Sequence, residues 1–96
     1  METTNRPLPS RERFRLMLKC YPRLAGFWDE SANELRYEEL KKAVGVLSRG
    51  EQIMARFYLS VWCGDNEGFD VLDAAGTLDL DSKKIIIAWM VDPFWP

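Results

Sequence analysis

Histidine is absent from this 96-residue sequence and only two cysteines occur in it, and both shortages limit the chemistry open to the protein. Histidine is the commonest general base and the commonest transition-metal ligand, so its absence argues against most catalytic and metal sites. Cys20 and Cys63 stand far apart, without the Cys-x-x-Cys spacing of zinc and redox motifs, and predict no disulfide framework. We therefore expect a protein without catalytic residues, bound metal or cofactor.

Long apolar runs are also lacking. No stretch is long enough to cross a bilayer, and the first residues, Met-Glu-Thr-Thr-Asn-Arg-Pro, lack the apolar segment of a signal peptide. We expect a cytoplasmic protein that does not contact membranes. With 47% hydrophobic and 12% aromatic residues, the chain has enough apolar material for one core and too little length for two. The sequence predicts a flexible arm over residues 1–9 and a single helical domain over residues 10–96.

The segment Ser48–Gly64 has the start, the period and the stop of a helix. Ser48 and Glu51 have the spacing of a capping box, in which each side chain binds a free backbone amide of the first turn. The large apolar residues that follow share one broad face: Ile53, Met54, Phe57, Tyr58, Val61 and Trp62. Gly64 suits a left-handed helix end. We expect the other segments to pack on this helix.

An earlier helix is predicted over residues 11–21, with Ser10 as its N-cap. Pro22 ends or kinks it, because proline has no amide for the helical hydrogen-bond ladder. Residues 24–28 are apolar and predict a turn or a one-turn helix, and residues 29–33 are polar and predict a turn.

Three more helices are predicted in the rest of the chain. Apolar residues at helical spacing indicate a helix over residues 37–47. Asp70 can cap a short helix that follows it directly, and Asp81 can cap a last helix over residues 81–91. The last helix is apolar almost all round, which is typical of a buried helix.

The run Ile85–Ile87 would also suit a buried strand, but the cap favours a helix and we see no second strand to pair with it. These segments together predict an all-α fold. We expect a compact single-domain bundle of four to five short helices around the central aromatic-rich helix, with Phe57, Trp62 and Trp89 buried together.

Charge is divided unevenly along the chain, although the formal total is only −2. Residues 1–24 carry six basic and two acidic side chains, a net charge of +4. From residue 25 onward there are seven basic and thirteen acidic side chains, a net charge of −6. Such asymmetry directs a charged partner toward one end of a molecule.

The stretch Asp65–Asp81 contains six carboxylates and no basic residue. Asp70 and Asp81 are explained as helix caps, whereas Glu67, Asp73 and Asp79 have no such duty in the sequence. We interpret these three as an acidic surface that binds a partner.

The residues Arg11, Arg15 and Lys19 form a basic stripe along the first predicted helix. Basic side chains on one exposed face can neutralise phosphates, so this stripe predicts a second surface for a protein partner or for nucleic acid. The close succession of helices at Leu47 and Ser48 could suggest a helix-turn-helix, but the second helix carries the largest apolar face in the chain.

Metal binding and catalysis are lower alternatives. A calcium-binding loop needs glycine at its sixth position and glutamate at its twelfth, and counting from Asp65 these positions hold Asp70 and Gly76. Asp70 and Asp73 could form a carboxylate pair of a small hydrolytic enzyme, but no nucleophile motif or glycine-rich phosphate loop accompanies them. A small-molecule substrate is not expected. The final aromatics Phe94 and Trp95 either fold back onto the core or anchor a partner, and we expect the first.

Three parts of the second half carry a resemblance: the segment from Leu47 through the aromatic helix, Asp73–Asp79, and Asp92–Pro96. Over residues 47–96 the chain resembles a small uncharacterised family of proteins from Gram-negative bacteria and their plasmids. No catalytic residues are assigned to that family, so none are carried over. The resemblance implies an accessory protein of a mobile element.

We therefore expect a non-catalytic protein-interaction module that binds or inhibits a host protein, for example a component of a defence system, through its charged surface. The alternative is a nucleic-acid-binding regulator that uses the basic first helix.

Overall fold

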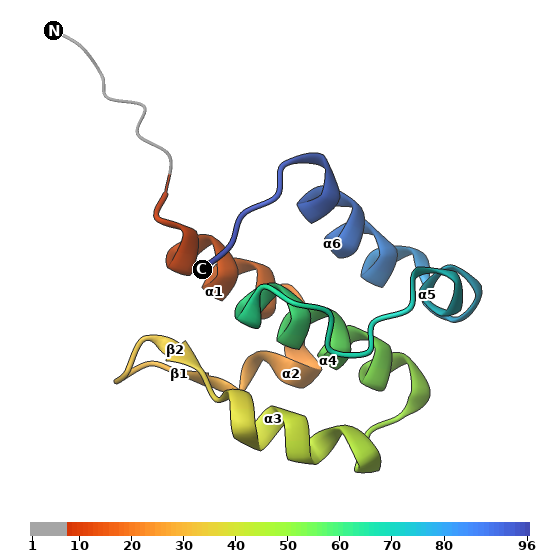
Figure 1. Ribbon diagram of the computed structural model, residues 1–96, viewed down its shortest axis with the longest axis horizontal. Helices are drawn as coiled ribbons and strands as arrows, with labels where there is room; N and C mark the ends of the chain where they lie inside the picture. Colours follow the sequence, from red (N-terminus) through yellow and green to blue (C-terminus); the bar gives the residue numbers. More distant parts are fainter. Residues whose placement is uncertain (1–7) are drawn as a thin grey trace, which may run out of the picture.

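The computed structural model describes residues 8–96, and the fold is built around its longest helix, α4 (Figure 1). The elements in chain order are α1 (Ser10–Lys19), α2 (Pro22–Ala25), β1 (Trp28–Asp29), β2 (Glu34–Leu35), α3 (Tyr37–Ala43), the 3₁₀ turn η1 (Val44–Val46), α4 (Arg49–Cys63), α5 (Val71–Thr77) and α6 (Leu80–Val91). The predicted all-α class and single small domain are confirmed, but the described residues form six α-helices where four to five were expected, and one minimal hairpin is added. Part of the predicted arm, residues 1–7, lies outside the described residues.

Helix α4 forms where the sequence predicts it. The Ser48 side chain accepts a hydrogen bond from the Glu51 amide, and the Glu51 carboxylate accepts one from the Ser48 amide at 3.0 Å, which completes the capping box. Gly64 ends the helix with a φ of 75°, a value that glycine adopts without strain. Helices α2, α3 and α5 all contact α4, so its buried face is the centre of the core.

Helix α1 begins one residue earlier than the sequence predicts. Its N-cap is Pro9, and Ser10 makes no capping bond, so the Ser10 cap prediction is wrong. Phe14 and Leu18 are fully buried against the core. The buried Tyr58 hydroxyl of α4 donates a hydrogen bond of 2.8 Å to the Met17 carbonyl, which ties α4 to α1.

A small hairpin, β1–β2, lies where the sequence predicts only a turn. Trp28 faces Leu35 across the two strands, and both side chains are buried. Asp29 accepts a hydrogen bond of 3.0 Å from the Ala32 amide, and Asn33 has a φ of 55°, a left-handed value that asparagine tolerates. Helix α3 then ends at Ala43 and continues as η1, so the predicted helix over residues 37–47 is divided in two.

The last two helices are capped by aspartates, but only one cap is the predicted one. Asp70 accepts hydrogen bonds from the Leu72 and Asp73 amides and begins α5, as expected. Helix α6 is capped by Asp79, whose carboxylate accepts from the Ser82 amide at 2.8 Å, so the prediction of Asp81 as the cap is wrong. The segment Ile85–Ile87 is helical, which excludes the strand alternative.

The expected burial of Phe57, Trp62 and Trp89 in one cluster is only partly correct. Phe57 is buried and its ring lies 5.8 Å from that of Trp89. Trp62 is half-buried and packs instead against Phe14 and Trp28, at 5.2 and 5.9 Å between ring centres. Trp62 lies near the end of α4 and packs toward α1 and the hairpin, whereas Phe57 packs toward α6.

Candidate protein-interaction surface

Helix α6 is apolar almost all round, yet of its twelve residues only Ser82 and Ile86 are buried. It lies at the edge of the fold, on the side of α4 opposite α3 (Figure 1). Ile87 and Val91 are 53% and 79% exposed. A soluble helix normally directs its apolar residues to the core and its charges to water, so the outer face of α6 departs from the usual pattern.

Exposed apolar side chains continue from α6 onto its neighbours. The large ones in this part of the chain are Val71, Leu72, Leu80, Ile87, Met90, Val91 and Trp95. Single exposed apolar residues are normal on protein surfaces, but a contiguous group of them marks an interaction site.

Two cavities run beside α6 and share the side chains of Phe69 and Met90. The first, about 360 Å³, lies between the end of α4, the loop after it and the C-terminal segment, with Trp95 in its wall. The second, about 140 Å³, lies between α5 and α6. We call the two together the α5–α6 groove. Its apolar lining comprises Phe57, Val61, Phe69, Val71, Ala74, Ala75, Ile86, Ile87, Trp89, Met90 and Trp95.

The C-terminal segment supplies one wall of the groove, and its two aromatics have different places. Phe94 is 8% exposed, lies under the Arg13 guanidinium at 4.3 Å, and accepts a hydrogen bond of 2.9 Å at its carbonyl from Trp89 Nε1. Trp95 is 59% exposed, and its ring lies 5.7 Å from that of Trp89 at an angle of 77°. The expected return to the core therefore holds for Phe94, while Trp95 lies at the surface.

The three predicted acidic residues are not free of structural duties, so that part of the sequence interpretation is wrong. Glu67 lies 3.4 Å from the Lys41 ammonium, and Asp73 forms an ion pair with Arg49. Asp79 caps α6, and the hydrogen bond from the Ser82 amide lowers the pKa of its carboxyl. The three come from different elements and do not form a single patch of unpaired charge. Their role in partner binding stays a prediction.

The basic stripe is likewise engaged within the molecule. The Arg11 guanidinium lies over the Trp62 ring at 4.9 Å and donates to the Asn33 carbonyl. Arg15 is paired with Glu12 at 2.7 Å, and Lys19 with Glu30 at 3.0 Å. These ion pairs neutralise charge that phosphate contacts would need.

A cluster of polar side chains joins α3 to the loop after α4, and it tests the enzymatic alternative. Cys63 Sγ lies 3.5 Å from the Glu67 carboxylate, which is paired with Lys41 next to the Tyr37 hydroxyl. A hydrogen bond from Tyr37 lowers the pKa of Glu67. Partial burial and the neighbouring carboxylates raise the pKa of the Cys63 thiol, the opposite of what a nucleophilic cysteine needs.

Neither Asp70 nor Asp73, the predicted carboxylate pair, lines either cavity of the α5–α6 groove. Within residues 8–96, the cysteine and carboxylate side chains form no group of three that could hold a metal ion, and no helix is long and apolar enough to cross a membrane.

One feature of the sequence does indicate the groove, although the interpretation based on the acidic surface and the basic stripe does not use it. The all-round apolar character of residues 80–91 is visible in the sequence, and it leads to an expectation of burial. The chain within residues 8–96 provides no element to cover the outer side of this helix (Figure 1). An apolar helix that the described residues leave partly uncovered is the pattern that indicates such a site.

Comparison of the chain with protein-family models, with curated proteins and with solved structures gives no match. The resemblance over residues 47–96 stays a prediction.

Proposed function

We propose that this protein is a non-catalytic protein-interaction module and that the α5–α6 groove is its contact surface. The observation that carries the proposal is the exposure of Ile87, Met90 and Trp95 along two adjoining cavities that share Met90. Burial of apolar surface is the main favourable term in most protein association, and large aromatics in partly formed pockets are typical anchors. The partner proposed is a host protein, in keeping with the plasmid-borne setting that the resemblance implies.

This proposal moves the contact surface from the charged residues to the apolar ones. Glu67 and Asp73 are each held by a basic residue of their own chain, so a partner would first have to break those pairs. The apolar side chains of α6 have no such intramolecular competitor. Exposed ion pairs contribute little to affinity, whereas a desolvated aromatic anchor contributes strongly.

Affinity capture from a bacterial lysate, with and without nuclease, tests the proposal when it is carried out on matched variants. Ile87→Ser with Met90→Ser removes the centre of the groove. Val46→Ser is the control, because Val46 is 87% exposed but lies in η1, on the side of the fold away from α6 (Figure 1). We expect a nuclease-resistant protein partner to be retained by the native protein and by Val46→Ser and to be lost from the groove variant.

A third variant, Glu67→Gln with Asp73→Asn and Asp79→Asn, tests the charged surface without removing the α6 cap, since asparagine caps helices as well as aspartate does. Loss of the partner from this variant alone would place the contact on the charged surface and contradict our assignment to the groove. Capture of nucleic acid that disappears with Arg11→Gln, Arg15→Gln and Lys19→Gln would favour the nucleic-acid alternative. Melting temperatures of all variants show whether each one is folded.

A further inference from the structure

The α5–α6 groove has a length and a direction that a partner must match. Lys83, Ile86, Ile87 and Met90 line it from α6, and the residues from 83 to 90 span two helical turns, about 10 Å. The groove continues past Met90 to Trp95. Helices α5 and α6 form its walls at one end, and the loop after α4 and the C-terminal segment form them at the other. The hairpin that could pair with an extended strand lies on another side of the fold (Figure 1). A depression of this kind fits an amphipathic helix, with apolar anchors one and two turns apart.

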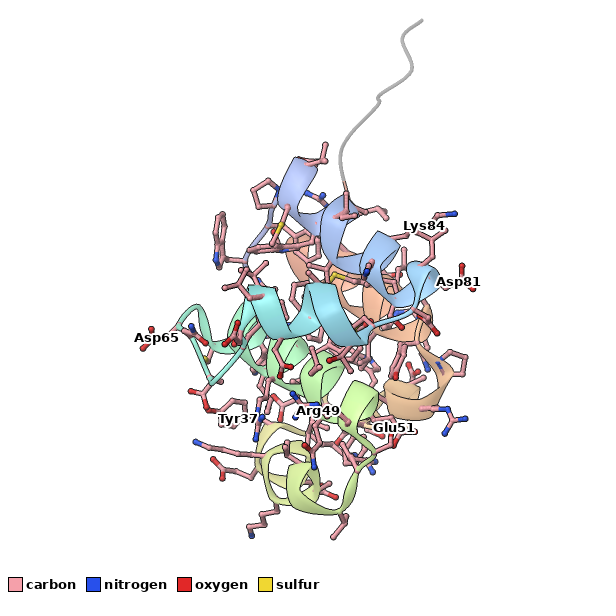
Figure 2. All side chains as sticks on the ribbon, turned by 90° about the vertical axis from the view of Figure 1, so that its right-hand side faces the viewer. Tyr37, Arg49, Glu51, Asp65, Asp81 and Lys84 are labelled. Carbon is pink, nitrogen blue, oxygen red and sulfur yellow. The ribbon has the colours of Figure 1, made fainter. Side chains whose placement is uncertain are left out.

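The border of the groove is acidic. Residues 64–96 carry seven acidic side chains and two basic ones. Three of the carboxylates, Glu67, Asp73 and Asp92, are paired with basic residues of other elements, so four carboxylates remain against Lys83 and Lys84, a net charge of −2. Figure 2 looks onto this face and shows Asp65 and Asp81 on opposite sides of it, both directed outward. Neither carboxylate forms an ion pair with any residue of the described range 8–96. Unpaired exposed carboxylates beside an apolar depression attract positive charge on a partner.

We infer that the occupant of the α5–α6 groove is an amphipathic helix of a partner protein that carries lysine or arginine beside its apolar stripe. This inference rests on the proposed function and specifies its partner. A second copy of the chain would place one acidic border against another, and like charges across an interface disfavour association. The charge around the groove therefore separates the two occupants that its apolar lining alone would accept equally.

The test uses two labelled helical peptides of about 14 residues, long enough to cover the groove. Both carry leucine one and two turns apart on one face. The first has lysine and arginine beside that stripe, and the second has glutamate at the same positions. Fluorescence anisotropy with the full chain is expected to give at least about tenfold tighter binding of the basic peptide at low salt, with the difference decreasing as salt rises.

Three variants locate the effect. Ile87→Ser is expected to abolish binding of the basic peptide. Asp65→Asn with Asp81→Asn is expected to remove most of the preference for that peptide. Glu38→Gln with Glu39→Gln changes the net charge by the same amount on the exposed side of α3 and is expected to leave the preference unchanged.

Equal binding of both peptides, or a preference that survives loss of Asp65 and Asp81, would overturn the inference. Failure of both peptides, with capture of a host protein still dependent on Ile87 and Met90, would also overturn it while leaving the proposed function intact. Sedimentation at pH 7.5 and low salt that shows a dimer disrupted by Ile87→Ser would assign the groove to a second copy of the chain.

Discussion

Tyr58 is a fully buried tyrosine, and its surroundings keep its hydroxyl protonated. Its side chain is inaccessible to solvent, and its hydroxyl donates to the Met17 carbonyl. Burial raises the pKa of Tyr58 far above its ordinary value, and the neighbouring Cys20 and Tyr21 act in the same direction. The hydrogen bond that joins α4 to α1 therefore requires the protonated hydroxyl.

The resulting prediction concerns alkaline stability. Because the folded-state pKa of Tyr58 is raised, its contribution to stability is complete below the unfolded-state pKa of about 10 and is lost as pH rises above it. At most about 1.4 kcal/mol per pH unit is expected from this one proton. Tyr58→Phe should cost about 0.5–1.5 kcal/mol at neutral pH, since it removes one hydrogen bond from the Met17 carbonyl, which the Cys20 amide still contacts at 3.2 Å, and it should flatten the alkaline loss.

Urea unfolding at several pH values measures both effects. The half-buried Tyr21 has no side-chain hydrogen bond within the described residues, so Tyr21→Phe is the control and should change stability little at neutral pH. An alkaline slope that is as steep in Tyr58→Phe as in the native protein would contradict this account.

The adjacent residues Phe94 and Trp95 allow stability to be separated from binding. Phe94→Ala removes a buried ring that packs under Arg13 and should cost about 3 kcal/mol, the lower end for large aromatic truncations. Trp95→Ala removes a mostly exposed ring and should change stability by no more than about 0.5 kcal/mol, while weakening partner binding. Thermal unfolding of the two variants measures both changes in stability. A large loss of stability in Trp95→Ala would mean that Trp95 belongs to the core.

At the scale of the helices, stability depends on how each one begins. Ser48→Ala removes a complete capping box from the central helix and should lower the free energy of unfolding by about 1 kcal/mol. Ser10→Ala is the matched control, because Ser10 stands at the start of α1 without capping it, and it should have almost no effect. Urea denaturation of the two variants measures these changes. Equal losses of unfolding free energy would show that the Ser48 capping box does not stabilise α4 more than an uncapped helix start does.

The helices predicted from the sequence were those with local signals. The capping box and apolar period of α4 lie within the segment itself, so they could be recognised without knowledge of the fold. The choice of Asp79 rather than Asp81 as the cap of α6 could not be recognised in this way, because both aspartates follow an apolar residue. It depends on tertiary packing, since Leu78 is buried and Leu80 is exposed. The strands of the hairpin have two residues each, too few to show a period.

The candidate groove was not predicted for a related reason. A helix that is apolar all round gives no preferred face, so the sequence cannot say which side of residues 80–91 meets the core. The charged residues appeared free because their partners are distant in the chain: Asp73 pairs with Arg49, and Glu67 with Lys41. Pairings of this kind are set by the three-dimensional arrangement of the helices.

At the scale of the whole molecule, the same chain carries an exposed apolar surface and an excess of negative charge around it. The apolar side chains favour self-association, and the carboxylates oppose it as long as they are ionised. The isoelectric point is close to 5.1, so the opposing charge decreases as pH falls from neutral toward that value. The balance between apolar attraction and charge repulsion should therefore determine the oligomeric state of the protein in solution.

We predict a monomer at pH 7.5 and low salt, and reversible association as the pH approaches about 5 or as added salt screens the acidic border. Sedimentation velocity across this range measures the association. Ile87→Glu and Val46→Glu add the same charge to two exposed apolar positions, one in the groove and one in η1. If the groove is the associating surface, Ile87→Glu should abolish association and Val46→Glu should only shift it to slightly lower pH. Equal behaviour of the two variants would mean that total charge alone keeps the protein monomeric and that the groove does not attract apolar partners.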